Sequence, residues 1–315
     1  MATELWERVL HQRGAATKAA VTDESVLVHE RTRLVCLDPA DGTLKWEARV
    51  GHWPDALLVV GPRVLVLSPG GALHCLSRST GAAHWRAELP PWTRHLAVAN
   101  GVALAGGWRG YTAQRAFDLA DGRLRWQFPV PVLTHRPVAW AGGFLLGNGT
   151  RAWLIDPLTG REQQSWQLPE PLPDTDFQDL FTAVDADRCA VRCGTSGVAL
   201  LQRDSPRAEL LLTHDAPLHY EPPLLAQGLL WLRGHRPDCA VAVDPADSTV
   251  VHRIGARHPL AHGILPPATV VTQAGTVLHP DGATTRLGIR TAAVHDLGGG
   301  RLLAVTRNSV RAYCL

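Results

Sequence analysis

The sequence has little lysine and little net charge. Only Lys18 and Lys45 are lysine among its 31 basic residues, and the formal net charge is +2. A surface dedicated to nucleic acid needs concentrated cationic charge, so this balance argues against nucleic acid as a partner. The bias toward arginine, alanine, glycine and proline is typical of a GC-rich bacterial genome.

The sequence also lacks a segment suited to export or to membrane insertion. Its first residues, "MATELWERVLHQRG", have no uninterrupted apolar core of the kind found in signal peptides. The apolar stretch "ALLVVGPRVLVLS" is interrupted by Pro62 and Arg63, which makes it too short to span a bilayer. We therefore expect a soluble, cytoplasmic protein, and a monomer, without membrane contact.

Closely spaced cysteine pairs are absent as well. None of the six cysteines forms a CxxC pair, which excludes a zinc ribbon. Cys189 and Cys193 lie four residues apart on a predicted strand and do not form a known ligand pattern. We expect no metal site.

What the sequence does contain is a repeat. The stretches "CLDPADGTLKW", "CLSRSTGAAHW", "AFDLADGRLRW" and "LIDPLTGREQQSW" end at Trp46, Trp85, Trp126 and Trp166, at spacings of 39, 41 and 40 residues. Within each unit, short alternating apolar runs are separated by turn residues, a pattern that predicts four antiparallel strands. The Asp-x-x-x-Gly turn suits this arrangement, because aspartate accepts backbone N–H bonds and glycine adopts positive φ.

The period continues through the weaker units and both chain ends. The C-terminal "RAYCL" matches "LVCL", and the N-terminal "ELWERV" matches the tryptophan strand "LKWEARV". The C-terminus therefore supplies three strands of a unit and the N-terminus supplies the fourth, which closes a ring and removes its sheet edges. The eight predicted outer strands contain Trp6, Trp46, Trp85, Trp126, Trp166, Leu212, His252 and Leu287.

We therefore predict an all-β fold. Residues 1–315 form a single domain, an eight-bladed β-propeller of four-stranded antiparallel blades, closed by the strand of Trp6. At this period the tryptophans are wedges between neighbouring blades rather than the lining of a cofactor site. Cys36, Cys75 and Cys314 are assigned to one equivalent strand position, as small core residues.

A strand ending in "LDP-x-DG" and followed by tryptophan resembles the tryptophan-docking repeat of the pyrroloquinoline-quinone-like (PQQ-like) propellers. The resemblance covers the whole chain and is strongest over residues 21–166. That superfamily includes quinoprotein alcohol dehydrogenases, an outer-membrane assembly scaffold and the sensor propellers of some bacterial serine/threonine kinases. The resemblance implies the fold, whereas function has to be argued from the site.

The cofactor of the quinoproteins is not expected here. Those enzymes resemble this chain in their repeat, but they are exported, longer, and carry a disulfide between adjacent cysteines beside the quinone. This sequence has no adjacent cysteines, no export signal and no identifiable acidic calcium cluster. We expect no PQQ and no other cofactor. The outer-membrane role is also disfavoured, because it requires a lipoprotein signal.

Histidine and arginine recur where the loops of a propeller surround the mouth of its central channel, the usual place for function. Histidines precede most of the predicted inner strands: His11, His52, His95, His135, His219, His258 and His262. The loops of the same face add Arg31, Arg109, Arg151, Arg233, His235, Arg236 and Arg307, with the acidic Asp55, Asp179 and Glu221. The densest clusters are His135–Arg136 and His219–Tyr220–Glu221.

Two functions fit such a rim, beside a purely structural role for the histidines as strand caps. The first is binding of a small anionic molecule, or of a peptide or protein segment, in a funnel of imidazole and guanidinium groups. The second is a cofactor-independent lyase, cyclase or isomerase of bacterial specialised metabolism, with His135 and His219 as acid–base candidates. Nucleophile-elbow, P-loop, dinucleotide and HExxH motifs are absent from the sequence.

Overall fold

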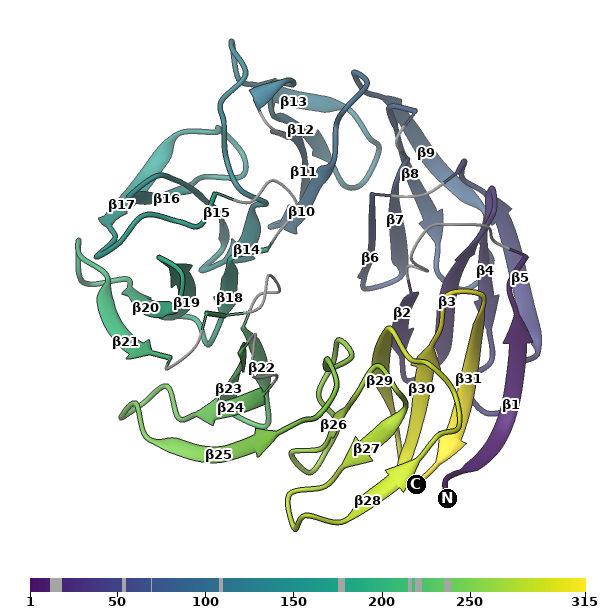
Figure 1. Ribbon diagram of the computed structural model, residues 1–315. Helices are drawn as coiled ribbons and strands as arrows, with labels where there is room; N and C mark the ends of the chain where they lie inside the picture. The colour runs from purple at the N-terminus through teal and green to yellow at the C-terminus, as the bar shows by residue number, and fades with distance from the viewer. Residues whose placement is uncertain are drawn as a thin grey trace.

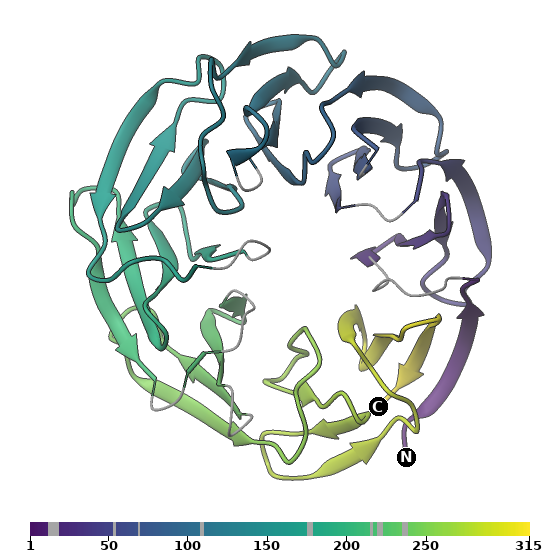
Figure 2. The same ribbon diagram turned by 45° about the horizontal axis from the view of Figure 1, so that its top comes forward.

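The computed structural model describes residues 1–11, 19–52, 55–68, 70–107, 110–174, 179–214, 217–218, 223–234 and 239–315. In these residues eight antiparallel sheets form a ring (Figures 1 and 2). Seven of the described sheets have four strands and one has three. The predicted eight-bladed all-β propeller is confirmed.

We number the blades in chain order and list their strands from the inner edge outward. Blades 1 and 2 consist of β2 (Ala19–Thr22), β3 (Ser25–Glu30), β4 (Arg33–Leu37) and β5 (Leu44–Arg49), then β6 (Ala56–Val60), β7 (Arg63–Ser68), β8 (Ala72–Ser77) and β9 (Ala83–Glu88). Blades 3 and 4 consist of β10 (His95–Ala99), β11 (Val102–Gly106), β12 (Arg115–Asp118) and β13 (Leu124–Gln127), then β14 (Val138–Trp140), β15 (Gly143–Asn148), β16 (Arg151–Ile155) and β17 (Glu162–Gln167).

Blades 5 to 8 complete the ring. Blades 5 and 6 consist of β18 (Phe181–Ala183), β19 (Arg188–Cys193), β20 (Gly197–Gln202) and β21 (Glu209–Thr213), then β22 (Leu224–Ala226), β23 (Leu229–Gly234), β24 (Cys239–Val243) and β25 (Val250–Gly255). Blades 7 and 8 consist of β26 (Val270–Val271), β27 (Thr276–Leu278) and β28 (Thr284–Arg286), then β29 (Ala293–Gly298), β30 (Arg301–Val305), β31 (Ser309–Cys314) and β1 (Thr3–Val9).

The two chain ends meet in blade 8, as predicted. The N-terminal β1 pairs antiparallel with the C-terminal β31, and Trp6 stands opposite Ala312. Arg311 reinforces the seam through ion pairs with Glu4 (3.0 Å) and Glu7 (2.7 Å). Figure 1 shows both termini on this blade, with purple β1 outside yellow β31. The blade therefore needs both ends of the chain.

Blade 7 is the least regular blade. Its inner side is the segment 260–265, which is held by the isolated bridges Leu260–Thr272 and Leu265–Thr269 in place of a fourth strand. Pro266 and Pro267 follow directly and have no N–H to donate to a sheet. The hydrogen-bond ladder of blade 7 is therefore short at its inner edge.

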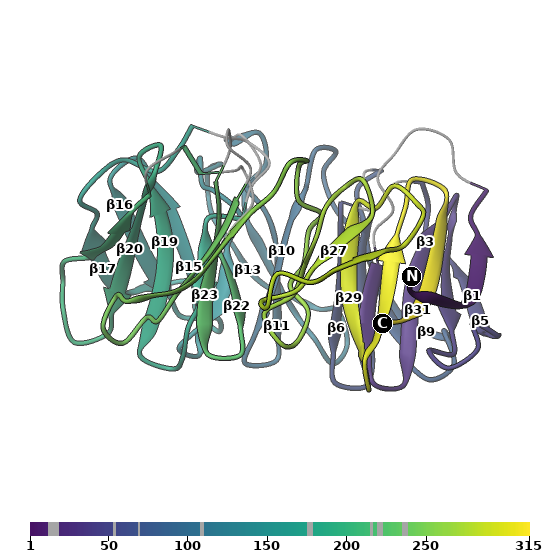
Figure 3. The same cartoon turned by 60° about the horizontal axis from the view of Figure 1, so that its bottom comes forward.

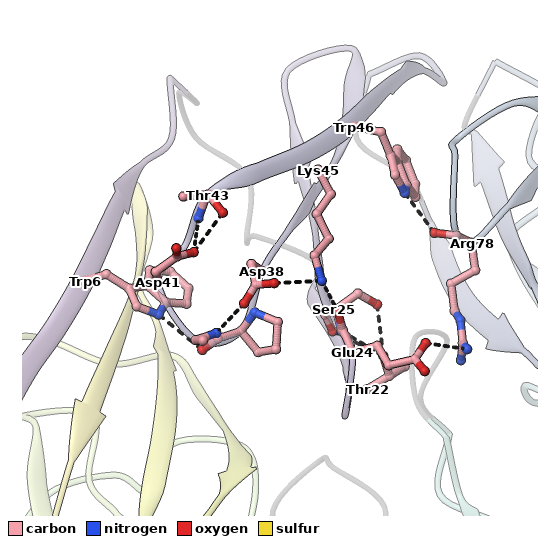
Figure 4. A network of polar contacts seen from close by, with 12 residues as sticks. Trp6, Thr22, Glu24, Ser25, Asp38, Asp41, Thr43, Lys45, Trp46 and Arg78 are labelled. Atoms are coloured by element: carbon pink, nitrogen blue, oxygen red, sulfur yellow. Dashed lines mark hydrogen bonds and ion pairs between the residues drawn. The ribbon is translucent and has the colours of Figure 1, made fainter.

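Tryptophans of the outer strands connect five of the blades to the blade that follows. The indole N–H donates to a main-chain carbonyl of the following blade in five cases: Trp6 to Pro39 (3.3 Å), Trp46 to Arg78 (2.8 Å), Trp85 to Leu119 (3.0 Å), Trp126 to Pro157 (2.8 Å) and Trp166 to Gln202 (2.8 Å). Figure 4 shows the first two. Because a buried indole N–H needs a partner, these bonds position the rings between blades.

The glycine of the repeated turn is required by the same contact. Gly81 has φ +70°, and a Cβ there would lie 2.4 Å from the Trp46 ring. In the preceding turn, the Asp38 carboxylate accepts the N–H of Ala40 (2.8 Å) and pairs with Lys45 (2.9 Å), as Figure 4 shows. Lys45 and the N–H of Ala40 hold the pKa of Asp38 below its ordinary value. The Asp–Gly signature of the sequence is thus a turn built to receive the tryptophan.

The register of the last blade differs from the sequence alignment. Cys36 stands opposite Trp46 and Cys75 opposite Trp85, and both are buried. Cys314, however, stands opposite Thr3 and is exposed, since the pairing of Trp6 puts Ala312 in the equivalent position. The assignment of Cys314 to the core was wrong by two residues.

Candidate functional site

One face of the ring is formed by the linkers between blades and by the turns that join the second and third strands; we call it the loop face. Main-chain bonds tie each linker to these turns: Val50 N–H donates to Thr32 (2.8 Å), and Leu218 N–H donates to Thr195 (3.0 Å). Figure 3 shows the blades from the side, with loops along both edges of the ring. The described segments that carry predicted histidines and arginines therefore share a face.

On one side of the loop face, charges are paired between neighbouring blades. Arg94, before blade 3, lies 3.6 Å from Asp55, before blade 2. Arg136, before blade 4, lies 3.8 Å from Asp179, before blade 5. These ion pairs neutralise Arg94 and Arg136, so neither of these two side chains offers an uncompensated charge to a ligand.

His95 is buried rather than open to the channel mouth. It is the first residue of β10, is 2% exposed, and neither ring nitrogen has a hydrogen-bond partner among the described residues. Burial, with Arg136 and His135 nearby, lowers its pKa to about 3. The imidazole is therefore neutral near pH 7 and does not attract an anion by charge.

The other predicted rim residues are dispersed. His135 is half-buried and its backbone N–H donates to Gly147 (3.0 Å), whereas His11, His52 and His258 are exposed. Arg151 extends along its own blade, over Trp153 and onto the Glu162 carboxylate, so it does not face the channel mouth. The predicted Arg109, His219, Tyr220, Glu221, His235 and Arg236 lie outside the described residues.

Buried basic side chains fasten the second strands to the next linker. Arg192 is 3% exposed and donates to the carbonyl of Leu218 (3.3 Å), and Arg233, 7% exposed, donates to that of Leu260. His29 is 2% exposed and donates from Nε2 to Gly51 (3.0 Å); burial lowers its pKa. Arg233, expected at the rim, is therefore part of the blade-to-blade framework.

A cavity of about 460 Å³ opens on the loop face between blades 7 and 8. We call it the blade 7–8 cavity. Main-chain bonds hold its walls together, from Gln273 N–H to Pro259 (2.6 Å) and from Thr291 N–H to Gln273 (3.0 Å). Its lining comes from two linkers and two turns: His258, Pro259, Gln273, Ala274, Arg290, Thr291, Ala292 and Arg307.

The polar groups of this cavity are basic or uncharged. Arg290 and Arg307 are exposed, and among the described residues neither forms an ion pair with an acidic side chain. Thr291 is 2% exposed, and its hydroxyl has no hydrogen-bond partner in the described part of the chain. An unsatisfied buried hydroxyl costs about 1–3 kcal/mol, and two guanidinium groups suit carboxylate or phosphate oxygens. The cavity thus combines two guanidinium groups with a buried hydroxyl, without an acidic side chain in its lining.

The sequence pattern predicted His258 and Arg307 as residues of the rim but did not predict Arg290 and Thr291. Both missed residues lie in the linker before blade 8, where the predicted histidine is absent and the repeat is weak. The sequence could have indicated Arg290 by its position alone, since it ends the stretch "RLGIR" just ahead of an inner strand.

The described residues do not fit a quinone or metal centre. They contain no group of three or more His, Cys, Asp or Glu side chains that could hold a metal ion. All six cysteines are free, five are buried, and no two are adjacent in the sequence.

Within the described residues, no helix is long and apolar enough to cross a membrane.

The fold defines an eight-bladed β-propeller with cationic recesses on its loop face. Residues 51–254 match the family described as outer membrane protein assembly factor BamB, and the chain belongs to that family. No curated protein matches the sequence.

Solved structures share the fold at low sequence identity. BamB from Moraxella catarrhalis superposes with a TM-score of 0.73 at 14% identity, covering 100% of this chain and 98% of its own. The computationally designed Ika8 protein gives 0.76 at 12% identity, covering 99% and 100%. A europium-containing methanol dehydrogenase gives 0.69 at 11% identity, covering 100% and 93%.

Proposed function

We propose that this propeller is a binding protein that takes up an anionic group in the blade 7–8 cavity. The group belongs either to a small anionic molecule or to an acidic segment of a partner protein, and no cofactor takes part. The observation that carries the proposal is the pair of cations Arg290 and Arg307, which form no ion pair in the described part of the chain. They lie beside the buried Thr291 hydroxyl, which has no hydrogen-bond partner there.

The family supports binding over catalysis. A relative of the same fold is named as an assembly factor, a role in protein association. The acid–base alternative has less support, since His135 lies beside a neutral, buried His95 and its own backbone is fixed to Gly147. We therefore expect uptake of ligand without turnover.

Replacing either cavity arginine tests the proposal. Arg290→Ala or Arg307→Ala should weaken binding of tripolyphosphate, and of a peptide of glutamates, about tenfold or more, because a hydrogen bond to a charged group contributes roughly 1.5–3 kcal/mol. Isothermal titration calorimetry at low salt measures the Kd. The two probes distinguish a small anion from an acidic segment as the preferred source.

Arg161→Ala is the matched control. Arg161 is exposed in the turn between β16 and β17, at the opposite face, and forms no ion pair among the described residues. This variant should bind both probes like the wild type. Equal binding by the wild type, Arg290→Ala and Arg307→Ala, all folded, would show that the cavity is not the site.

A further inference from the structure

We infer that the ligand is an extended acidic segment of a partner protein, which occupies the blade 7–8 cavity and a second cavity on blade 2 and crosses the edge of blade 1 between them. This inference rests on the proposed function and names the source of its anionic groups. A single small anion cannot fill two cavities separated by a blade.

The second cavity, the blade 2 cavity, has a volume of about 480 Å³. It lies on the loop face too, because its walls include the linker residues Gly51 and His52 and the turn residue Gly70. Its basic groups are Arg49 and Arg86. Arg49 is exposed and has no ion pair among the described residues.

Arg86 is available to a ligand even though it has a partner. It pairs with Glu88 at 2.5 Å, but both side chains are more than half exposed, at 55% and 71%. Exposed pairs of this kind contribute little to stability, so an incoming carboxylate can replace Glu88. His74 in the same cavity is kept neutral, since burial and Arg86 lower its pKa, and it offers a hydrogen bond rather than a charge.

The edge of blade 1 joins the two cavities without an unpaired acidic group in its described turn. Glu30 pairs with Arg8 (3.3 Å) and accepts the N–H of His11 (3.2 Å). Arg31 donates to the carbonyl of His11 (2.7 Å), a contact that does not cancel its charge. A negative segment that crosses the described turn therefore meets the guanidinium of Arg31 and an already paired Glu30.

Cations that form no ion pair with another described residue thus gather on one contiguous arc, blades 7, 8, 1 and 2, which are neighbours because β1 and β31 close the ring. The arc contrasts with blades 3 to 5, where Arg94 is neutralised by Asp55 of the preceding linker and Arg136 by Asp179 of the next linker. An extended segment of about ten residues spans roughly 33 Å. Anchoring both of its ends would raise its affinity through a high effective concentration.

The experiment compares two peptides on the full-length protein. One carries a single cluster of glutamates, and the other carries two clusters joined by an uncharged Gly/Ser linker of roughly ten residues. We expect the two-cluster peptide to bind about tenfold tighter or more. Arg49→Ala should remove at least about half of that advantage on a logarithmic scale, whereas tripolyphosphate binding should remain sensitive to Arg290→Ala in the Arg49→Ala background. Arg161→Ala should change neither.

Each outcome is decisive. Equal affinities of the protein for the two peptides would overturn the two-cavity inference, and so would an advantage of the two-cluster peptide that survives Arg49→Ala. In either case the proposed function would still stand if tripolyphosphate binding remained sensitive to Arg290→Ala. Wild-type protein that binds neither peptide nor tripolyphosphate would overturn the proposed function itself. Melting temperatures of all variants should match, since Arg49 and Arg290 are exposed.

Discussion

Deletion of residues 1–10 is expected to destabilise the propeller by more than about 5 kcal/mol and to promote aggregation. The deletion removes β1, and with it the buried side chains of Trp6 and Leu10, which are 8% and 2% exposed. Replacing a buried tryptophan by alanine alone costs about 3–5 kcal/mol. The deletion also exposes the edge of β31, an unpaired strand that invites association with other chains.

The measurement is thermal unfolding with size-exclusion chromatography. Trp6→Ala serves as the milder comparison, because it keeps the β1–β31 ladder but removes the indole from its place against Gly42. It should lower the melting temperature less than the deletion does. A deletion variant that is monomeric and melts like the wild type would show that β1 does not complete blade 8.

Acidification from pH 7 to pH 5 is expected to cost about 4 kcal/mol of stability through two histidines. Burial and the nearby Arg136 and His135 lower the pKa of His95 to about 3, while burial and the nearby His262 lower that of His295 to about 4. The unfolded chain has ordinary histidines with pKa near 6.5. Below that pH the unfolded state binds protons that the folded state does not, so stability is complete above it and falls toward pH 4.

Urea unfolding at the two pH values measures the effect. Each histidine should account for about 2 kcal/mol, so His95→Gln should remove about 2 kcal/mol of the pH dependence and His95→Gln with His295→Gln about 4 kcal/mol. The lowered pKa values of His29 and His74 should leave a residual dependence in the double variant. Val241→Ala, destabilised in the core but retaining both histidines, should keep the full dependence. If the His95→Gln protein responds to pH like the wild type, His95 does not have a lowered pKa.

The ring was predictable from the sequence because its determinants are local and periodic. A tryptophan, a turn that ends in glycine and alternating apolar residues recur in each strong unit, and the bond from Trp46 to the carbonyl of Arg78 uses such a turn directly. Closure followed from the match between the two chain ends. Cys314 shows the limit, since a short match such as "RAYCL" does not distinguish registers two residues apart.

The candidate site was less predictable because it depends on which charged side chains form ion pairs in the folded protein. Arg136 and Arg290 both lie in linkers ahead of an inner strand, yet only Arg136 is neutralised, by Asp179 of the next linker. That pairing joins residues 43 positions apart and leaves no local signal in the sequence. The direction of a side chain is also not visible in the sequence. Arg151, for example, extends along its own blade and pairs with Glu162.

The location of a bound anion tests the central claim most directly. Tungstate has the shape of phosphate and scatters X-rays anomalously, so a crystal grown with it reports where an anion binds. We predict an anomalous peak in the blade 7–8 cavity, within hydrogen-bonding distance of the Thr291 hydroxyl and of Arg290 or Arg307, and its loss in the Arg290→Ala, Arg307→Ala double variant. Tungstate bound at other places on the protein with the blade 7–8 cavity empty would contradict the account.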